Sequence, residues 1–212
     1  MRTLISSLVG AVLLASFAAL GSGLISAVYE ETKVPIAKAE RAAEAKQLLE
    51  IFPQSSHDNE LIDDGFVIAA NDALLALREP GTGYRARRGN AVSGIIIPAT
   101  ARDGYSGDIR LLVGINSDGM IAGVRILGHR ETPGLGDKIE LRKSNWVLSF
   151  NDKTLSNPTP TSWAVTKDGG EFDAFTGATV TPRAVVAAVR KALEYSNNNR
   201  DALFEIAKAN ES

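Results

Sequence analysis

The chain contains no cysteine, which excludes a disulfide framework, iron–sulfur ligation and thiolate chemistry. Histidine is almost as scarce: only His57 and His129 occur among the 212 residues, too few for a histidine-rich metal site. Neither sign of charge is in large excess, since the formal net charge is −2. This small net charge gives no reason to expect a nucleic-acid partner. Because cysteine is absent and histidine is scarce, we also expect no metal site.

Several catalytic signatures are also missing. The sequence has no Gly-x-Ser-x-Gly motif, no P-loop and no Gly-x-Gly-x-x-Gly dinucleotide motif. Gly134-Leu-Gly136 lacks the preceding strand, the following helix and the third glycine of a Rossmann fold. His129 and Glu131 have the His-x-Glu spacing of zinc deaminases, but those enzymes need cysteine ligands. We therefore expect no catalytic residues and no separate substrate pocket.

Charge is absent from one long N-terminal stretch. Leu4 to Val28 contains no charged residue, and at about 1.5 Å per helical residue this stretch exceeds a hydrocarbon core of about 30 Å. It predicts a transmembrane anchor within residues 1–29. A cleaved signal peptide is the alternative, because Ala15-Ser-Phe-Ala18 resembles a cleavage site.

The charges that flank this stretch predict its orientation. Arg2 precedes the apolar residues, whereas Glu30 and Glu31 follow them. Positive charge favours the cytoplasmic side of a membrane helix. We therefore expect a cytoplasmic N-terminus, with residues 30–212 on the outer side.

Residues 30–90 are expected to form a membrane-proximal helix and a connecting region. Pro35 to Leu49 is alanine-rich and predicts a helix that ends before Pro53. After it we expect a strand, a short helix and a turn, at residues 66–70, 73–77 and 80–83 respectively. The basic run Tyr84 to Arg88 predicts a solvated strand or loop face, with a partner or lipid contact as the alternative.

Residues 91–195 have the pattern of a folded domain with an antiparallel sheet. Val92 to Ile97 predicts a buried strand closed by Pro98. Asp118-Gly119, between residues 109–115 and 120–127, predicts a hairpin, and residues 163–166 predict a further strand. Together with the flanking helices, these strands predict an α+β fold.

A helix is expected near the end of this domain. Thr181 is its predicted N-cap, Pro182 its first helical residue and Tyr195 its approximate end. Residues 196–212 then form a tail, with a short amphipathic helix at 201–208. The turn Thr176-Gly-Ala-Thr179 lies just before the helix, where free N–H groups and the helix dipole favour a bound phosphate. An ordinary turn and cap is the alternative interpretation.

The run Asp173-Ala-Phe-Thr-Gly-Ala-Thr179 resembles a flavinylation signature, Asp-x-x-(Ser/Thr)-Gly-Ala-(Thr/Ser). That signature belongs to the FMN-binding domains of Rnf/Rsx electron-transport complexes and sodium-pumping quinone reductases. Upstream, Gly104-Tyr-Ser-Gly-Asp-Ile109 and His129-Arg-Glu-Thr-Pro-Gly-Leu-Gly136 agree with it in order. The combination is most similar to the G subunits of Rnf/Rsx complexes, and the likeness extends from the N-terminus to about residue 195.

The resemblance implies a function and a cofactor. FMN would be joined through its phosphate to Thr179 by a flavin transferase that uses FAD and recognises Asp173. The chain would relay electrons beside other membrane subunits of an ion-translocating complex. It would be a single-pass protein of the cell inner membrane, with its FMN domain in the periplasm. A scaffold without flavin and a noncovalent FMN reductase are the alternatives.

The resemblance also implies which residues surround the flavin. The loop 131–136 has two glycines that allow close backbone approach to a planar ligand. The expected contacts, besides Thr179 and Asp173, are Thr176, Gly177, Ala178, Thr181, Glu131, Thr132, Leu135, Gly136 and Lys138. His129 is expected only to orient the loop. Trp146 and Trp163 are candidates for stacking on the flavin ring, with burial in the core as the alternative.

Overall fold

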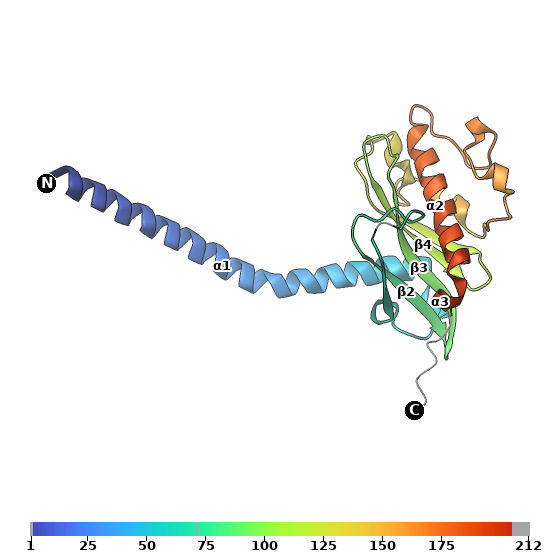
Figure 1. Cartoon of the computed structure of the whole chain (residues 1–212), viewed down its shortest axis with the longest axis horizontal. Helices are drawn as coiled ribbons and strands as arrows, with labels where there is room; N and C mark the ends of the chain where they lie inside the picture. Colours follow the sequence, from blue (N-terminus) through green and yellow to red (C-terminus); the bar gives the residue numbers. More distant parts are fainter. Residues whose placement is uncertain (1, 71, 205–212) are drawn as a thin grey trace. The chain divides into compact units, whose positions relative to one another are not determined.

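The computed structural model describes residues 2–70 and 72–204. The chain divides into two compact units, Met1–Glu44 and Ala45–Ser212. The first unit is helical throughout its described residues. The second holds a five-stranded sheet and the helices that cover it (Figure 1).

Helix α1 (Arg2–Ile51) is continuous, so the anchor and the helix predicted from Pro35 are one element. Pro35 lacks a backbone N–H but has a φ compatible with helix, so it lies inside α1 without ending it. Gly10–Ile51 contains a window long and apolar enough to cross a membrane. Leu14, Phe17 and Leu20 expose 75%, 77% and 74% of their surface, which suits contact with lipid tails.

The sheet is an antiparallel meander with the order β1-β2-β3-β4-β5. The predicted hairpin is confirmed, because β4 pairs with β5 on either side of Asp118-Gly119. Two strands come from the stretch expected to connect the anchor to the domain. The five strands are β1 (Gly65–Ile68), β2 (Gly81–Arg88), β3 (Ala91–Ala101), β4 (Ile109–Asn116) and β5 (Ile121–Gly128).

The sheet is buried on both faces. In β3, Ile95 and Ile97 belong to the larger core, whereas Ile96 between them belongs to a smaller core on the other face. The smaller core includes Leu48 and Ile51, from the last turns of α1. This double burial explains why residues 92–97 are apolar without alternation.

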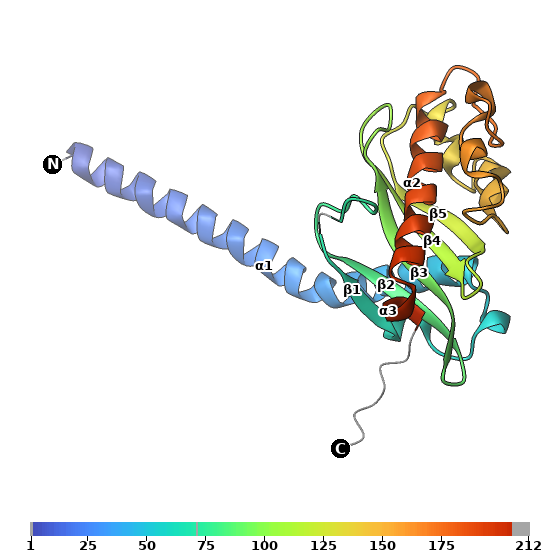
Figure 2. The ribbon, with the colours of Figure 1, turned by 45° about the vertical axis from the view of Figure 1, so that its right-hand side comes forward.

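Helix α2 (Val180–Asn198) packs along β3 and β4 and covers the larger core, as both views in Figures 1 and 2 show. Val185, Val189 and Ala192 recur at helical spacing and are fully buried, so they form its inner face. The short helix α3 (Arg200–Phe204) follows and buries Leu203. The α+β class predicted from the sequence is therefore confirmed.

In the described part of the second unit, residues 45–70 and 72–204, there are also six short 3-10 helices. They are η1 (Gln54–Ser56), η2 (Leu61–Asp63), η3 (Gly136–Ile139), η4 (Asn145–Phe150), η5 (Pro160–Ser162) and η6 (Thr166–Asp168). η4 and the segment from it to α2 contribute a cluster of buried aromatic rings in mutual contact: Trp146, Phe150, Trp163, Phe172 and Phe175. These rings fix the irregular segment that leads into α2.

Two predictions before residue 91 are wrong. Residues 73–77 form a turn and not a helix, because the Asp72 carboxylate accepts the N–H groups of Leu74 (2.8 Å) and Leu75 (3.0 Å). Ala76 has a φ of +54°, which a helix does not allow. The turn predicted at residues 80–83 is instead the start of β2, since Gly81 pairs with Ile68 of β1.

Two strand predictions also need correction. Pro98 does not close β3, which continues to Ala101. Pairing with β2 ends at Ile96, so at Pro98 the strand is paired only with β4 and the missing N–H is tolerated. Residues 163–166 form no strand, because only an isolated bridge joins Val165 to Phe172.

The ends of the last helices differ from prediction as well. Helix α2 begins at Val180 with Thr179 as its N-cap residue, and it continues past Tyr195 to Asn198. The predicted helix at 201–208 is α3 as far as Phe204, and residues 205–208 lie outside the described residues.

Gly94 provides a test of the smaller core. A Cβ there would lie 2.4 Å from Cζ of Phe52, a ring held between α1 and the sheet. We expect Gly94→Ala to lower the free energy of unfolding by about 1–3 kcal/mol through overpacking. Tryptophan fluorescence during thermal unfolding of the full chain in detergent measures this. Gly123→Ala is the control, because a Cβ there would lie 3.6 Å from its nearest neighbours, which is an ordinary van der Waals distance. Equal loss in both variants would contradict the packing argument.

Candidate functional site

A cavity of about 360 Å³ lies at the N-terminal end of α2, beside Thr179. It brings together the two segments that the sequence singled out, the loop at 131–136 and the turn at 176–181. Its lining residues are Tyr105, Glu131, Thr132, Leu135, Gly136, Gly177, Ala178, Thr179, Val180 and Thr181. Eight of the eleven predicted contacts therefore line one cavity.

Thr179 lies at the junction of the turn and the helix. Gly177 adopts a φ of +82°, and this left-handed residue reverses the chain just before α2. Thr179 is the N-cap residue, but its hydroxyl makes no capping hydrogen bond. Lys167 Nζ instead donates to Thr179 Oγ1 over 3.4 Å. Thr179 is half-buried. Its hydroxyl therefore remains partly accessible, has no capping role and lies next to a cation.

Thr181 is not the N-cap that the sequence predicted. It lies within the first turn of α2, is almost fully buried, and its hydroxyl donates to Glu131 Oε2. The other oxygen of Glu131 accepts the backbone N–H of Ser106 over 2.9 Å. Glu131 is only 3% exposed, so this carboxylate joins three segments at the cavity wall.

Gly136 makes this close approach possible. A Cβ at Gly136 would lie 2.9 Å from both Glu131 Cβ and Thr181 Oγ1. Any side chain would separate the loop from the helix. The second loop glycine, Gly134, has a φ of +78° and donates its N–H to Asp137 Oδ1 (2.8 Å), which closes the turn. Gly136 is thus required because a side chain has no room there, and Gly134 is required because its φ is positive.

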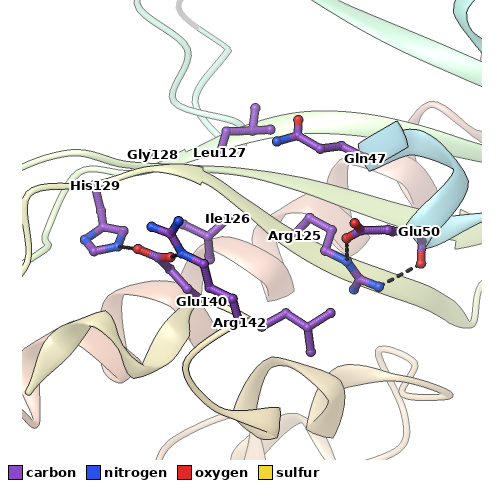
Figure 3. A pocket seen from close by; sticks show the side chains of 10 residues that line it. Gln47, Glu50, Arg125, Ile126, Leu127, Gly128, His129, Glu140 and Arg142 are labelled. Atoms are coloured by element: carbon purple, nitrogen blue, oxygen red, sulfur yellow. Dashed lines mark hydrogen bonds and ion pairs between the residues drawn. The ribbon is translucent and has the colours of Figure 1, made fainter. Parts of the chain in front are cut away.

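His129 holds the loop from behind, as predicted. Its Nδ1 accepts the N–H of Glu131 (3.0 Å), so the proton lies on Nε2, which donates to Glu140 Oε1 over 2.7 Å. Figure 3 shows His129, Glu140 and Arg142 in a row along a neighbouring cavity. The pKa of Glu140 is held below its ordinary value, chiefly by the hydrogen bond from Arg142 and further by that from His129, against the effect of burial.

Three predicted contacts do not line the cavity: Asp173, Thr176 and Lys138. Asp173 and Thr176 are exposed on the turn before α2. Neither tryptophan lines the cavity, because Trp146 and Trp163 are 8% and 6% exposed within the aromatic cluster. Trp146 Nε1 donates to the carbonyl of Asp173 (2.9 Å), so this ring supports the turn from the core.

Sequence reasoning missed Tyr105, Lys167 and Val180. Tyr105 belongs to the Gly104–Ile109 motif, which signalled that the segment matters but not which side chain faces the cavity. Lys167 has no sequence signal, because its approach to Thr179 depends on the fold of η6. Arg183 on α2 pairs with the neighbouring Asp168 (2.5 Å) and ties η6 to the helix.

The cavity suits an organic cofactor with a phosphate group. Within residues 2–70 and 72–204, no group of three or more His, Asp or Glu side chains could hold a metal ion. The cavity lies at a helix N-terminus, and Lys167 approaches Thr179 in its wall; both features favour an anion. Tyr105, Leu135 and Val180 line the cavity and favour an apolar or planar group.

Comparison with known proteins gives two family matches. An FMN-binding domain model matches residues 104–194, which include all the cavity residues. An RnfG N-terminal region model matches residues 1–51, which include all of α1.

Relatives that match over most of the chain share one name, the G subunit of an ion-translocating oxidoreductase complex. The protein from Pseudomonas aeruginosa strain UCBPP-PA14 is 50% identical over 199 residues, 94% of this chain and 92% of the relative. That from Shewanella baltica is 46% identical over 194 residues, covering 92% and 91% of the two chains. That from Vibrio cholerae strain O395 is 45% identical over 191 residues, covering 90% of each.

Acid titration tests the support behind the loop. Folding lowers the pKa of Glu140, so this carboxylate stabilises the protein above its unfolded pKa, and the stability is lost as pH falls through the folded value. We expect the wild type to lose stability below about pH 4.3, and Glu140→Gln to lose less over that range. Denaturant unfolding at several pH values measures this. Glu79→Gln removes an exposed carboxyl group and is the control. Its free energy of unfolding should fall with pH as that of the wild type does. If the free energy of unfolding fell equally steeply with pH in Glu140→Gln and Glu79→Gln, the role of Glu140 would be refuted.

Proposed function

This chain belongs to the family of ion-translocating oxidoreductase complex G subunits, and from that membership we propose that it carries FMN covalently on Thr179. The bond would join the FMN phosphate to the threonine hydroxyl. The protein would relay electrons among the other membrane subunits of such a complex. It would be a single-pass protein of the inner membrane, with its N-terminus in the cytoplasm and the FMN domain in the periplasm.

The observation that carries the proposal is the contrast between the threonine hydroxyls of the cavity. Thr181 is buried and committed to Glu131, so it is unavailable as a nucleophile. Thr179 is half-buried, has no capping bond and lies beside Lys167. Thr132 belongs to the loop at 131–136 and is exposed. Thr179 alone combines access with a cationic environment.

The charges at this end of α2 fit a phosphodiester. The ester would retain one negative charge, next to the N–H groups at the start of the helix. Such a charge gains about 0.3–1 kcal/mol from the helix dipole at an exposed site. Lys167 Nζ, now 3.4 Å from Thr179 Oγ1, would be within reach of an added phosphate oxygen. Arg183 is paired with Asp168, whereas the Lys167 amine points at the Thr179 hydroxyl.

The attachment step balances with FAD as donor. The Thr179 oxygen would bond to the phosphorus next to riboflavin, the phosphoric anhydride bond would break, and AMP would leave. The hydroxyl proton would pass to a base of the flavin transferase. Asp173 is exposed on the turn before Thr179, so its carboxylate is available for recognition by that enzyme.

The remaining cavity residues fit the flavin ring. Tyr105 and Leu135 provide apolar surface at the mouth, and the absence of a side chain at Gly177 leaves the backbone open to close approach. When bound, FMN supplies one- and two-electron chemistry. The residues of this chain only hold and orient it, and a covalent bond prevents its loss outside the cytoplasm.

Intact mass tests the attachment site. After co-expression with a flavin transferase, we expect an FMN adduct on the wild type and on Thr179→Ser, but none on Thr179→Ala, because only the hydroxyl can form the ester. Thr132→Ala, which removes another cavity hydroxyl, should keep the adduct.

Flavin fluorescence in a denaturing gel separates the alternatives. A colourless wild type in the presence of an active transferase would indicate a scaffold. Flavin that is present before denaturation but absent from the gel would indicate a noncovalent reductase.

Tyr105 offers a test of ring placement. It is the only aromatic residue among those that line the cavity, and it is 72% exposed. We expect Tyr105→Leu to raise the fluorescence of the attached flavin, because a tyrosine ring in contact quenches flavin emission by electron donation. Emission lifetimes, compared at equal flavin content by mass, measure this. Tyr195→Phe on α2 is the control, and an unchanged lifetime in Tyr105→Leu would exclude contact.

A further inference from the structure

Another cavity, of about 540 Å³ and distinct from the one in Figure 3, lies next to the proposed flavin site and is strongly basic. We call it the arginine cleft. It is lined by Arg78, Ser106, Gly107, Asp108, Arg110, Gly128, His129 and Arg130. Asp108 is the only carboxylate among these residues, and Arg78 pairs with it through two hydrogen bonds of 2.6 and 3.1 Å. Two positive charges are left over, on Arg110 and Arg130.

These two arginines are exceptional within the described side chains, residues 10–70 and 72–204. Every other arginine there has a hydrogen bond or ion pair, whereas Arg110 and Arg130 have neither. Both are exposed, and both line the same cleft. The other arginines are held by carboxylates or, as for Arg88 and Arg102, by backbone carbonyls. Arg110 and Arg130 therefore place two guanidinium groups without such partners in one cleft, where an anionic group could pair with them.

The local structure keeps Arg110 open. Arg110 on β4 lies opposite Gly128 on β5. A Cβ at Gly128 would be 3.0 Å from Arg110 Nη2, so the lack of a side chain at Gly128 makes room for the guanidinium. A guanidinium in this position presents a planar fork of donors that matches a carboxylate.

The arginine cleft and the flavin cavity share a wall. Tyr105 and Glu131 line the flavin cavity. Their neighbours in the chain, Ser106 and Arg130, line the arginine cleft. The bond from Ser106 N–H to Glu131 (2.9 Å) closes the wall between them. At the flavin mouth, Tyr105 and Leu135 expose 72% and 41% of their surface. Exposed tyrosine and arginine side by side are typical of protein interfaces.

We propose that the arginine cleft, together with Tyr105, docks a carboxylate-rich surface of the subunit that exchanges electrons with the flavin. The proposal rests on the proposed function, which requires a redox partner close to the cavity mouth. Acidic side chains of that partner would pair with Arg110 and Arg130. Complementary charge would fix its orientation and speed its association.

Site-specific cross-linking in the assembled complex tests this surface. Ser106 is replaced by the photoreactive residue p-benzoylphenylalanine, because it lines the cleft without using its side chain in a hydrogen bond. The expected product joins position 106 to another subunit, at a segment that contains Asp or Glu. We expect Arg110→Glu and Arg130→Glu each to lower the yield about 10-fold or more, since close charge pairs across an interface are strongly coupled. Lys191→Glu, an equal charge change on the exposed face of α2, should leave the yield unchanged.

Other outcomes would overturn the proposal. A cross-link to lipid would assign the cleft to a phosphate headgroup, and equal yields in Arg110→Glu and Lys191→Glu would remove the role of charge. Absence of any product in an assembled complex would show that the cleft faces solvent.

Measuring flavin content and cross-linking on the same samples separates the docking proposal from the proposed flavin attachment. A wild type without adduct that still cross-links defeats only the flavin proposal, whereas a flavinylated chain that does not cross-link defeats only the docking surface.

Discussion

The buried Glu131 carboxylate is the constraint on which the site depends. One oxygen accepts the hydroxyl of Thr181 in the first turn of α2, and the other accepts the N–H of Ser106. A charged group that is 3% exposed would be very costly without such partners. The carboxylate therefore forces the helix, the loop and the Tyr105 turn into one arrangement, with the space beside Thr179 left between them.

The fold supplies a rigid base for this arrangement. Helix α2 is packed along the central strands β3 and β4, so its first turn cannot shift without disturbing the core. On the other side of the loop, His129 holds the backbone of Glu131 and is itself held by Glu140. The cavity is thus framed by groups that are fixed from both directions, while its mouth remains exposed. Such a site holds a cofactor firmly and still lets another protein reach it.

The apolar runs rich in β-branched residues and the Asp118-Gly119 turn are local signals, and they predicted the class of fold. The residues expected around the cofactor came from the resemblance of the 131–136 and 173–179 segments to a known family, and eight of them line one cavity. Prediction from the sequence failed where a distant contact decides the local structure. Thr181 has the residue type of an N-cap, yet its hydroxyl is taken by Glu131, fifty residues earlier in the chain. Trp146 has the residue type of a flavin-stacking ring, yet an aromatic cluster buries it. Lys167 reaches Thr179 only because η6 folds beside α2.

The same carboxylate also links the two cavities of this region. The Ser106 N–H that it accepts belongs to a residue that lines the arginine cleft, whereas Glu131 itself lines the cavity beside Thr179. A substitution at Glu131 would therefore alter the shape of both cavities at once. In this fold the basic surface and the neighbouring cavity cannot vary independently.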